Sequence, residues 1–169
     1  MLRKWKHDDI RELVGASLGN CRVLCRSNSQ DRFDCDLESL INVVRKRSRH
    51  FKHKRHLKIC FGHAAKLVNL YVKALVSRRD VLSTRNANHI AKYAHVPLDR
   101  IMLKRVLHDF PEVNSGKAIK RNMAIKDLNE KQYKLIQDKI RVCADNVGMK
   151  PLDYDLWWAV RPKTSRGND

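Results

Sequence analysis

The chain has 169 residues, of which 43% are apolar, so it suits one folded domain and is not a wholly disordered chain. Its 36 Lys and Arg outnumber 18 Asp and Glu, which leaves a net charge of +18 at pH 7. Such an excess of one sign repels itself in a compact state and favours a polyanionic partner, either nucleic acid or an anionic membrane.

The first half of the chain predicts helices. A short helix is expected over residues 8–19, with two aspartates at its start and a glycine at its end. Apolar residues then recur at helical spacing over 37–44. Asp34, Asp36 and Glu38 lie at the front of this second helix, where carboxylates complement the helix dipole, so we interpret them as helix-start residues and not as a metal site.

The next long element is predicted over residues 57–76. Its first residues alternate between apolar and polar, which fits a short strand as well as a helix. From residue 64 to 76 the pattern is apolar nearly all round, which is typical of a central, buried helix. One polar line crosses that helix, formed by Lys66, Asn69 and Lys73 at spacings of three and four.

The second half of the chain predicts shorter elements. Residues 81–94 are polar, and we expect a loop with a helical turn there. Pro97 suits the first turn of a following helix. After a looser basic segment, Asn129 and Gln132 resemble a capping box in front of another helix, which Gly148 ends.

Together these elements predict an all-α fold. We expect a single compact domain of about five helices over residues 1–160, packed around the buried helix at 64–76. Pro151 opens a last short element, in which Trp157 and Trp158 are expected to pack on the core. Residues 161–169 are expected to be a disordered basic tail.

A block of cations between residues 39 and 79 dominates the charge pattern, because no Asp or Glu occurs there. Clustered Lys and Arg bind the closely spaced phosphates of nucleic acid without reading its bases. Solvated helix faces usually mix both signs, so a single-signed block favours nucleic-acid binding over a merely solvated face. The residues that we expect to hold phosphates are Arg45, Lys46, Arg47, Arg49, Lys52, Lys54, Arg55, Lys58, Lys73, Arg78 and Arg79.

Histidines and a cysteine recur in and beside this block at spacings of three and four. They are His50, His53, His56, Cys60 and His63. Neighbouring cations oppose a bound dication and the paired-ligand signature of zinc sites is missing, so we expect no metal and no cofactor. Arg45 and His50 also resemble the short Arg-x4-His signature of helical toxin ribonucleases. The five cysteines include no Cys-x-x-Cys pair and are expected to be free thiols.

Two segments resemble parts of helix-hairpin-helix DNA glycosylases. Residues 62–69, Gly-His-Ala-Ala-Lys-Leu-Val-Asn, are similar to the glycine turn and lysine-bearing helix of that family, and residues 95–101, His-Val-Pro-Leu-Asp-Arg-Ile, to its aspartate segment. The resemblance implies that Lys66 is a Schiff-base nucleophile and Asp99 a base or carbocation stabiliser, acting on a flipped base. The Leu-Pro-Gly-Val-Gly hairpin of the family is missing. Otherwise Asp99 is a helix-start residue and Lys66 faces phosphate.

Three functions therefore stay open. The first is a binding module for DNA or RNA, the second is a DNA-base-processing enzyme, and the third is a protein-interaction factor or inhibitor that docks on an acidic partner. No charge-free stretch of about 18 apolar residues and no apolar stretch of a signal peptide occur in the sequence. We therefore expect no membrane partner and a location in the cytoplasm, or in the nucleus of a eukaryotic cell. The sequence does not indicate an oligomeric state.

Overall fold

Six α-helices and three short 3-10 helices make up the residues that the structure describes. The computed structural model describes residues 21–48, 59–78, 80–115, 119 and 123–154. No strand occurs in these residues, which confirms the predicted all-α fold. In chain order the elements are η2 (Cys21–Arg26), α2 (Gln30–Ser48), α3 (Phe61–Ser77), α4 (Thr84–Tyr93), α5 (Arg100–Asp109), α6 (Pro111–Ser115), η3 (Ile125–Asp127), α7 (Glu130–Asn146) and η4 (Pro151–Asp153).

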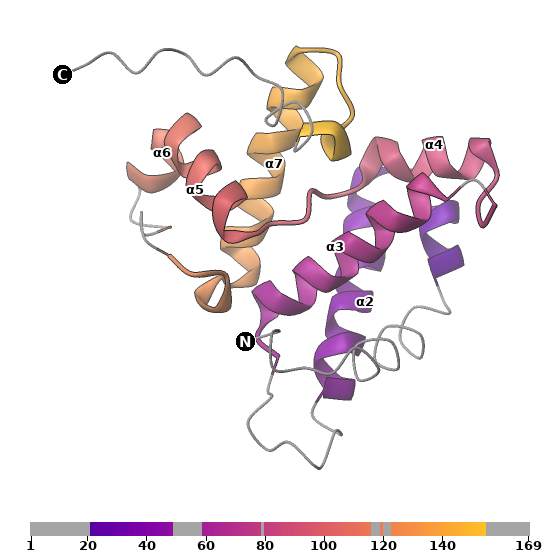
Figure 1. Ribbon diagram of the computed structural model, residues 1–169, viewed down its shortest axis with the longest axis horizontal. Helices are drawn as coiled ribbons and strands as arrows, with labels where there is room; N and C mark the ends of the chain where they lie inside the picture. The colour runs from indigo at the N-terminus through magenta and orange to yellow at the C-terminus, as the bar shows by residue number, and fades with distance from the viewer. Residues whose placement is uncertain (1–20, 49–58, 79, 116–118, 120–122, 155–169) are drawn as a thin grey trace.

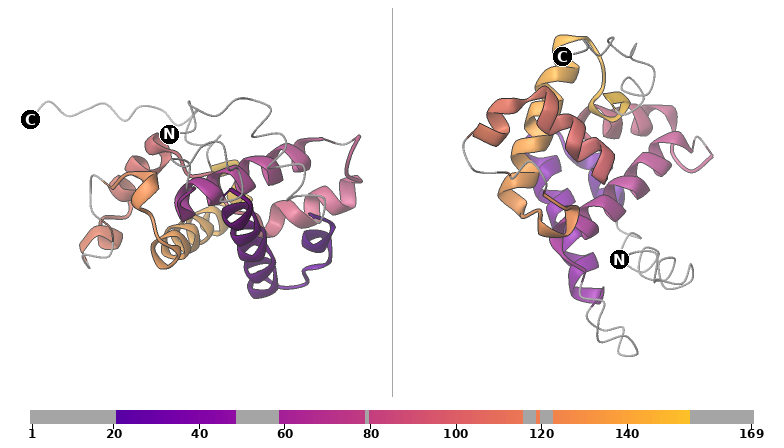
Figure 2. Two further views of the ribbon diagram at one scale, coloured as in Figure 1. Left: turned by 90° about the horizontal axis from the view of Figure 1, so that it is seen from below. Right: turned by 60° about the vertical axis from the view of Figure 1, so that its left-hand side comes forward.

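The helices form one domain in two groups. Figure 1 shows α2, α3 and α4 together on one side of α7, with α5 and α6 on its other side, and Figure 2 shows the same grouping. α3 contacts α2, α4, η3 and α7, and η4 contacts both α4 and α7. Three predictions lie outside the described residues: the helix over 8–19, the core role of Trp157 and Trp158, and the basic tail.

α2 and α3 pack against each other through the apolar residues that the spacing predicts. α2 buries Leu37, Leu40, Ile41 and Val44, as the spacing predicts, and also buries Phe33 before them. α3 begins at Phe61, so the strand considered for the start of this element does not form there. The structure does not confirm that α3 is a central helix buried along its length. Most of its first nine residues are buried, but Leu70 is 44% exposed.

The first turn of α3 approaches η3 so closely that only glycine fits. A Cβ atom on Gly62 would collide with the backbone carbonyl of Ile125 and would press on the side chain of Leu128. A backbone carbonyl held in a short helical turn has little freedom to move away. The missing side chain of Gly62 therefore allows α3 and η3 to pack together.

The prediction of a mere helical turn over 81–94 is wrong, because a regular helix, α4, fills this stretch. The Ser83 side chain caps it by accepting a hydrogen bond from the backbone N–H of Asn86 at 3.3 Å. Its buried residues are Ala87, Ile90 and Ala91. Two alanines and one isoleucine make a weak apolar signal in a polar sequence. Packing of this short face against α3 supplies the stability that the local pattern lacks.

Pro97 does not lie in the first turn of a helix, and this prediction is also wrong. α5 begins at Arg100, while Pro97 lies in a buried stretch without helix that joins α4 to α5. The Gln137 side chain of α7 binds both backbone groups of Val96: its oxygen accepts from the N–H at 3.0 Å, and its nitrogen donates to the carbonyl at 2.9 Å. A proline disfavours helical geometry in the residue before it, and Gln137 satisfies the backbone left without helical bonds.

The ends of α7 agree with the prediction. Asn129 and Gln132 form a complete capping box, each side chain accepting a hydrogen bond from the other's backbone at 3.0 Å. At the other end Gly148 has a φ of 68°, and the N–H of Met149 donates to the carbonyl of Ala144 at 2.8 Å. This geometry is that of a glycine-terminated helix. Pro151 then opens η4, as expected.

Candidate nucleic-acid interface

The predicted phosphate-binding residues fall into two groups. Arg45, Lys46 and Arg47 lie in the last turn of α2, Lys73 lies on α3, and Arg78 directly follows α3. The remaining predicted residues lie outside the described residues. They are Arg49, Lys52, Lys54, Arg55, Lys58 and Arg79.

Lys46 and Arg47 are the exposed cations at the end of α2. Both are exposed, and neither forms an ion pair with another described residue. They stand at the carboxyl end of α2, where cations complement the helix dipole. All acidic residues of α2 precede them by at least two turns, the last being Glu38. The last turns of α2 therefore carry cations and no acidic residue.

Arg45 differs from its two neighbours because its guanidinium group is engaged within the fold. It lies over the ring of Phe61, 5.8 Å from the ring centroid, and donates to the side-chain oxygen of Asn42 at 3.1 Å. Its Nε is buried without a hydrogen-bond partner among the described residues. Arg45 therefore ties the end of α2 to the start of α3 and offers only part of its guanidinium group to a ligand.

The polar line predicted along α3 divides into two environments. Lys66 and Lys73 are partly exposed, whereas Asn69 between them is fully buried. α3 carries no Asp or Glu at all. Burial, together with the charge of Lys66, lowers the pKa of His63, so this imidazole is neutral at pH 7. The cations of α3 thus extend the basic character of the end of α2.

Arg78 already has an anionic partner. Its Nε and one terminal nitrogen donate to the two carboxylate oxygens of Asp80 at 2.7 and 2.6 Å. The hydrogen bond from Arg78 lowers the pKa of Asp80 to about 2, so Asp80 stays ionised. A phosphate would have to displace this carboxylate, which makes Arg78 a weaker candidate than Lys46 or Arg47.

Asp99 caps α5. Its carboxylate accepts a hydrogen bond from the backbone N–H of Met102 at 2.7 Å, which satisfies one of the free donors at the helix start. Lys66 lies near the start of α3. The structure thus gives Asp99 the structural role considered from the sequence, at the N-cap and not within the first turn. The catalytic roles implied for Asp99 and Lys66 stay predictions.

A buried polar network joins four parts of the fold and was not expected as a unit from the sequence. His95, between α4 and α5, lies 2.9 Å through its Nε2 from Asp34 on α2 and 2.8 Å through its Nδ1 from the hydroxyl of Tyr133 on α7. Asn69 on α3 donates to the same hydroxyl at 2.7 Å. His95, Tyr133 and Asn69 are all buried. No spacing rule connects these residues, because they come from distant parts of the chain.

The partners define the direction of each hydrogen bond in this network. Asp34 can only accept when ionised, so Nε2 of His95 donates to it. Burial raises the pKa of Asp34, but the hydrogen bond and charge of His95 bring its pKa below the ordinary value, helped by Gln30 and Arg141. Burial raises the pKa of Tyr133 above its ordinary value, so its hydroxyl stays protonated. His95 therefore links Tyr133 to Asp34 through its two ring nitrogens.

The network is suited to holding helices together. Arg141 covers its outer end, with one nitrogen 3.5 Å from Asp34 and 3.2 Å from His95. Deeper inside, the amide oxygen of Asn69 is buried without a hydrogen-bond partner among the described residues. Because the imidazole is only 4% exposed, a substrate has little access to it. We therefore assign these side chains a structural role.

Only two of the histidines and cysteine that recur at spacings of three and four lie within the described residues. Cys60 Sγ lies 2.9 Å from His63 Nδ1 at the start of α3, while His50, His53 and His56 lie outside the described residues. Among residues that the structure describes, no group of three or more potential metal-binding side chains occurs. Cys25, Cys35, Cys60 and Cys143 are thiols.

Comparison of the chain with models of protein families, with curated proteins and with solved structures gives no match. The resemblance to helix-hairpin-helix glycosylases therefore stays a prediction that depends on two short segments. Within the described ranges, no helix has the length and apolar character needed to cross a membrane.

Proposed function

We propose that this protein binds nucleic acid through the α2–α3 basic surface, which we define by Lys46, Arg47, Lys66 and Lys73. The observation that supports the proposal most directly is the pair Lys46 and Arg47, exposed at the end of a helix with no acidic neighbour in its last turns. A polyanion supplies the negative charge that α2 does not place beside Lys46 and Arg47.

The position of the remaining cations in the sequence supports the same surface. Residues 49–58 follow directly after α2 and carry five further Lys and Arg and no acidic residue. Ser48 before them and Ile59 after them are both buried. These five cations therefore lie in a segment whose flanking residues, Ser48 and Ile59, are buried in the fold.

The proposed contacts are to phosphates and not to bases. Lys and Arg that neutralise phosphates release condensed counterions, so affinity falls steeply with salt concentration. Such contacts position a protein on nucleic acid but carry no sequence information. We therefore propose a binding module whose affinity depends on backbone charge.

Fluorescence anisotropy with labelled single-stranded DNA, duplex DNA and RNA at several salt concentrations tests this proposal. The decisive variant is Lys46→Gln/Arg47→Gln. Loss of two phosphate contacts lowers the slope of log affinity against log salt by about 1.4 on single strands and 1.8 on duplex. A matched control is Lys134→Gln/Lys139→Gln, which removes the same charge from two lysines that already pair with carboxylates.

If the two double variants lose affinity and salt slope equally, net charge alone governs binding. The assignment of the phosphate contacts to the α2–α3 basic surface would then be wrong. Absence of binding by the wild-type protein near physiological salt would reject nucleic-acid binding altogether. A pull-down partner that survives nuclease treatment would then favour an acidic protein partner.

A further inference from the structure

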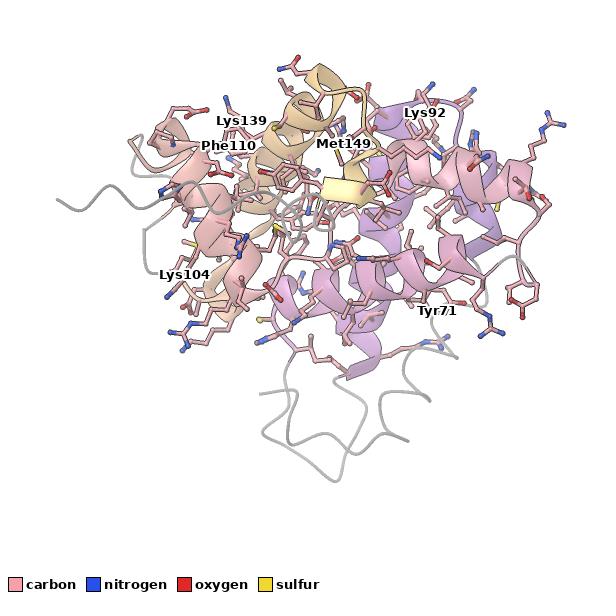
Figure 3. All side chains as sticks on the ribbon, turned by 45° about the horizontal axis from the view of Figure 1, so that its top comes forward. Tyr71, Lys92, Lys104, Phe110, Lys139 and Met149 are labelled. Carbon is pink, nitrogen blue, oxygen red and sulfur yellow. The ribbon has the colours of Figure 1, made fainter. Side chains whose placement is uncertain are left out.

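α5 has an outward face that carries cations and no acidic residue. Arg100, Lys104 and His108 are exposed at successive turns, and Arg105 is partly exposed beside them. Ile101 stands among them and is 63% exposed. The opposite face of α5, with Met102, Leu103, Val106 and Leu107, is buried in the core. Figure 3 shows Lys104 at the outer edge of the molecule.

The acidic residues of this region lie at the ends of α5 and not on its outward face. Asp99 caps the first turn. Asp109 in the last turn accepts from the hydroxyl of Tyr154 at 3.3 Å and lies 3.2 Å from Nδ1 of His108. Arg100 and Lys104 form no ion pair with another residue that the structure describes. Their charges are therefore accessible to a ligand.

α7 shows what an ordinary solvated helix face looks like in the same protein. Lys134 pairs with Glu130 on its own helix at 3.1 Å and with Glu38 at 3.0 Å, and Arg141 pairs with Asp138 at 3.0 Å. Opposite charges at these spacings stabilise a helix. The outward face of α5 lacks this pattern of alternating signs, so solvation alone does not account for its composition.

The arrangement on α5 is unfavourable for the isolated helix. Arg100 and Lys104 are like charges four residues apart on α5. Arg100 also occupies the first residue of α5, where the positive end of the helix dipole opposes a cation. A bound polyanion removes both unfavourable interactions.

We infer that the outward face of α5 is a second phosphate-contacting surface, in which Arg100 and Lys104 contact the backbone of nucleic acid. The inference rests on the proposed function and extends it to a helix outside the block between residues 39 and 79.

Competitive acetylation of the wild-type protein tests this surface without any substitution. N-hydroxysuccinimidyl acetate is applied with and without a saturating oligonucleotide, and the acetylated fraction of each lysine is read by mass spectrometry. We expect the oligonucleotide to lower the acetylated fraction of Lys104 and Lys46 several-fold. Lys139 pairs with Glu112 at 3.2 Å, and its acetylated fraction should be the same with and without the oligonucleotide. Protection of Lys46 without protection of Lys104 overturns the inference and leaves the proposed function intact.

The variant Arg100→Gln/Lys104→Gln provides the second measurement. Both positions are exposed, so circular dichroism should show an unchanged fold. The salt slope is expected to fall by about 1.4 to 1.8, as for two lost phosphate contacts, and to add to the effect of Lys46→Gln/Arg47→Gln. A slope equal to that of the Lys134→Gln/Lys139→Gln control overturns the inference. If the wild-type protein binds no nucleic acid, the proposed function and this inference both fail.

Discussion

His95 lies 2.9 Å from Asp34 and thereby connects the stretch between α4 and α5 to α2, across 61 residues of sequence. The imidazole reaches Tyr133 of α7 with its other nitrogen, and Asn69 of α3 completes the same chain of hydrogen bonds. A buried polar group without its partner is costly, so each member of this network should matter for stability.

Tyr133→Phe removes the hydroxyl that stands between His95 and Asn69. It leaves a buried imidazole nitrogen and a buried amide donor without this partner, so we expect the free energy of unfolding to fall by about 2–3 kcal/mol. Urea unfolding measures this loss. Tyr93→Phe, at a partly exposed position, is the control and should change stability by less than about 0.5 kcal/mol. Equal effects of the two substitutions would contradict the structural role of the network.

Because of Asp34, the free energy of unfolding should decrease at acid pH. Its pKa in the folded protein lies below the ordinary value of 3.8, so its stabilising contribution is complete above that value and is lost as the pH falls through the folded pKa. We expect Asp34→Asn to flatten the decrease in unfolding free energy between about pH 5 and pH 3. Asp31→Asn, at an exposed position of the same helix, is the control. A pH dependence unchanged by Asp34→Asn would reject this linkage.

Gly62→Ala should destabilise the protein because its new methyl group meets the backbone carbonyl of Ile125. We expect a loss of about 2–3 kcal/mol, since a backbone atom cannot rotate away as a side chain can. Gly148→Ala is an informative comparison, because nothing lies within 4 Å of the added methyl group and only the φ of 68° opposes it. That change should cost about 1 kcal/mol. Thermal unfolding of both variants would contradict the packing argument if Gly148→Ala proved the more damaging change.

Asp99 allows the structural and the catalytic interpretations to be separated. Asp99→Ala removes the N-cap of α5 and should lower the unfolding free energy by about 1 kcal/mol, whereas Asp99→Asn keeps an acceptor for the Met102 N–H and should lower it less. If the glycosylase resemblance reflects function, Asp99→Asn abolishes base excision from a damaged-base duplex while binding persists. A wild-type protein that binds such duplexes without excising a base leaves Asp99 with the capping role alone.

Local patterns in the sequence were sufficient wherever a short run of residues determines the geometry. The spacing of Leu37, Leu40, Ile41 and Val44 predicts the buried face of α2. The helix begins earlier than this pattern indicates, at Gln30, and buries Phe33 as well. The capping box before α7 and Gly148 after it act over a few residues only, so they were readable without the rest of the fold. The all-α class follows from these periodicities.

The features that depend on residues far apart in the sequence were decided only by the tertiary structure. α4 forms because α3, η2 and η4 pack against it and bury Ala87, Ile90 and Ala91. The backbone of Val96 leaves helical geometry, and Gln137 of α7 satisfies its hydrogen bonds. The network around His95 likewise exists only when four segments meet. The net charge of +18 follows directly from the sequence. Packing, however, decides that Lys134 pairs with a carboxylate while Lys46 stays exposed. An ion pair or a buried hydrogen bond needs two groups within about 3 Å, and only the folded chain sets that distance.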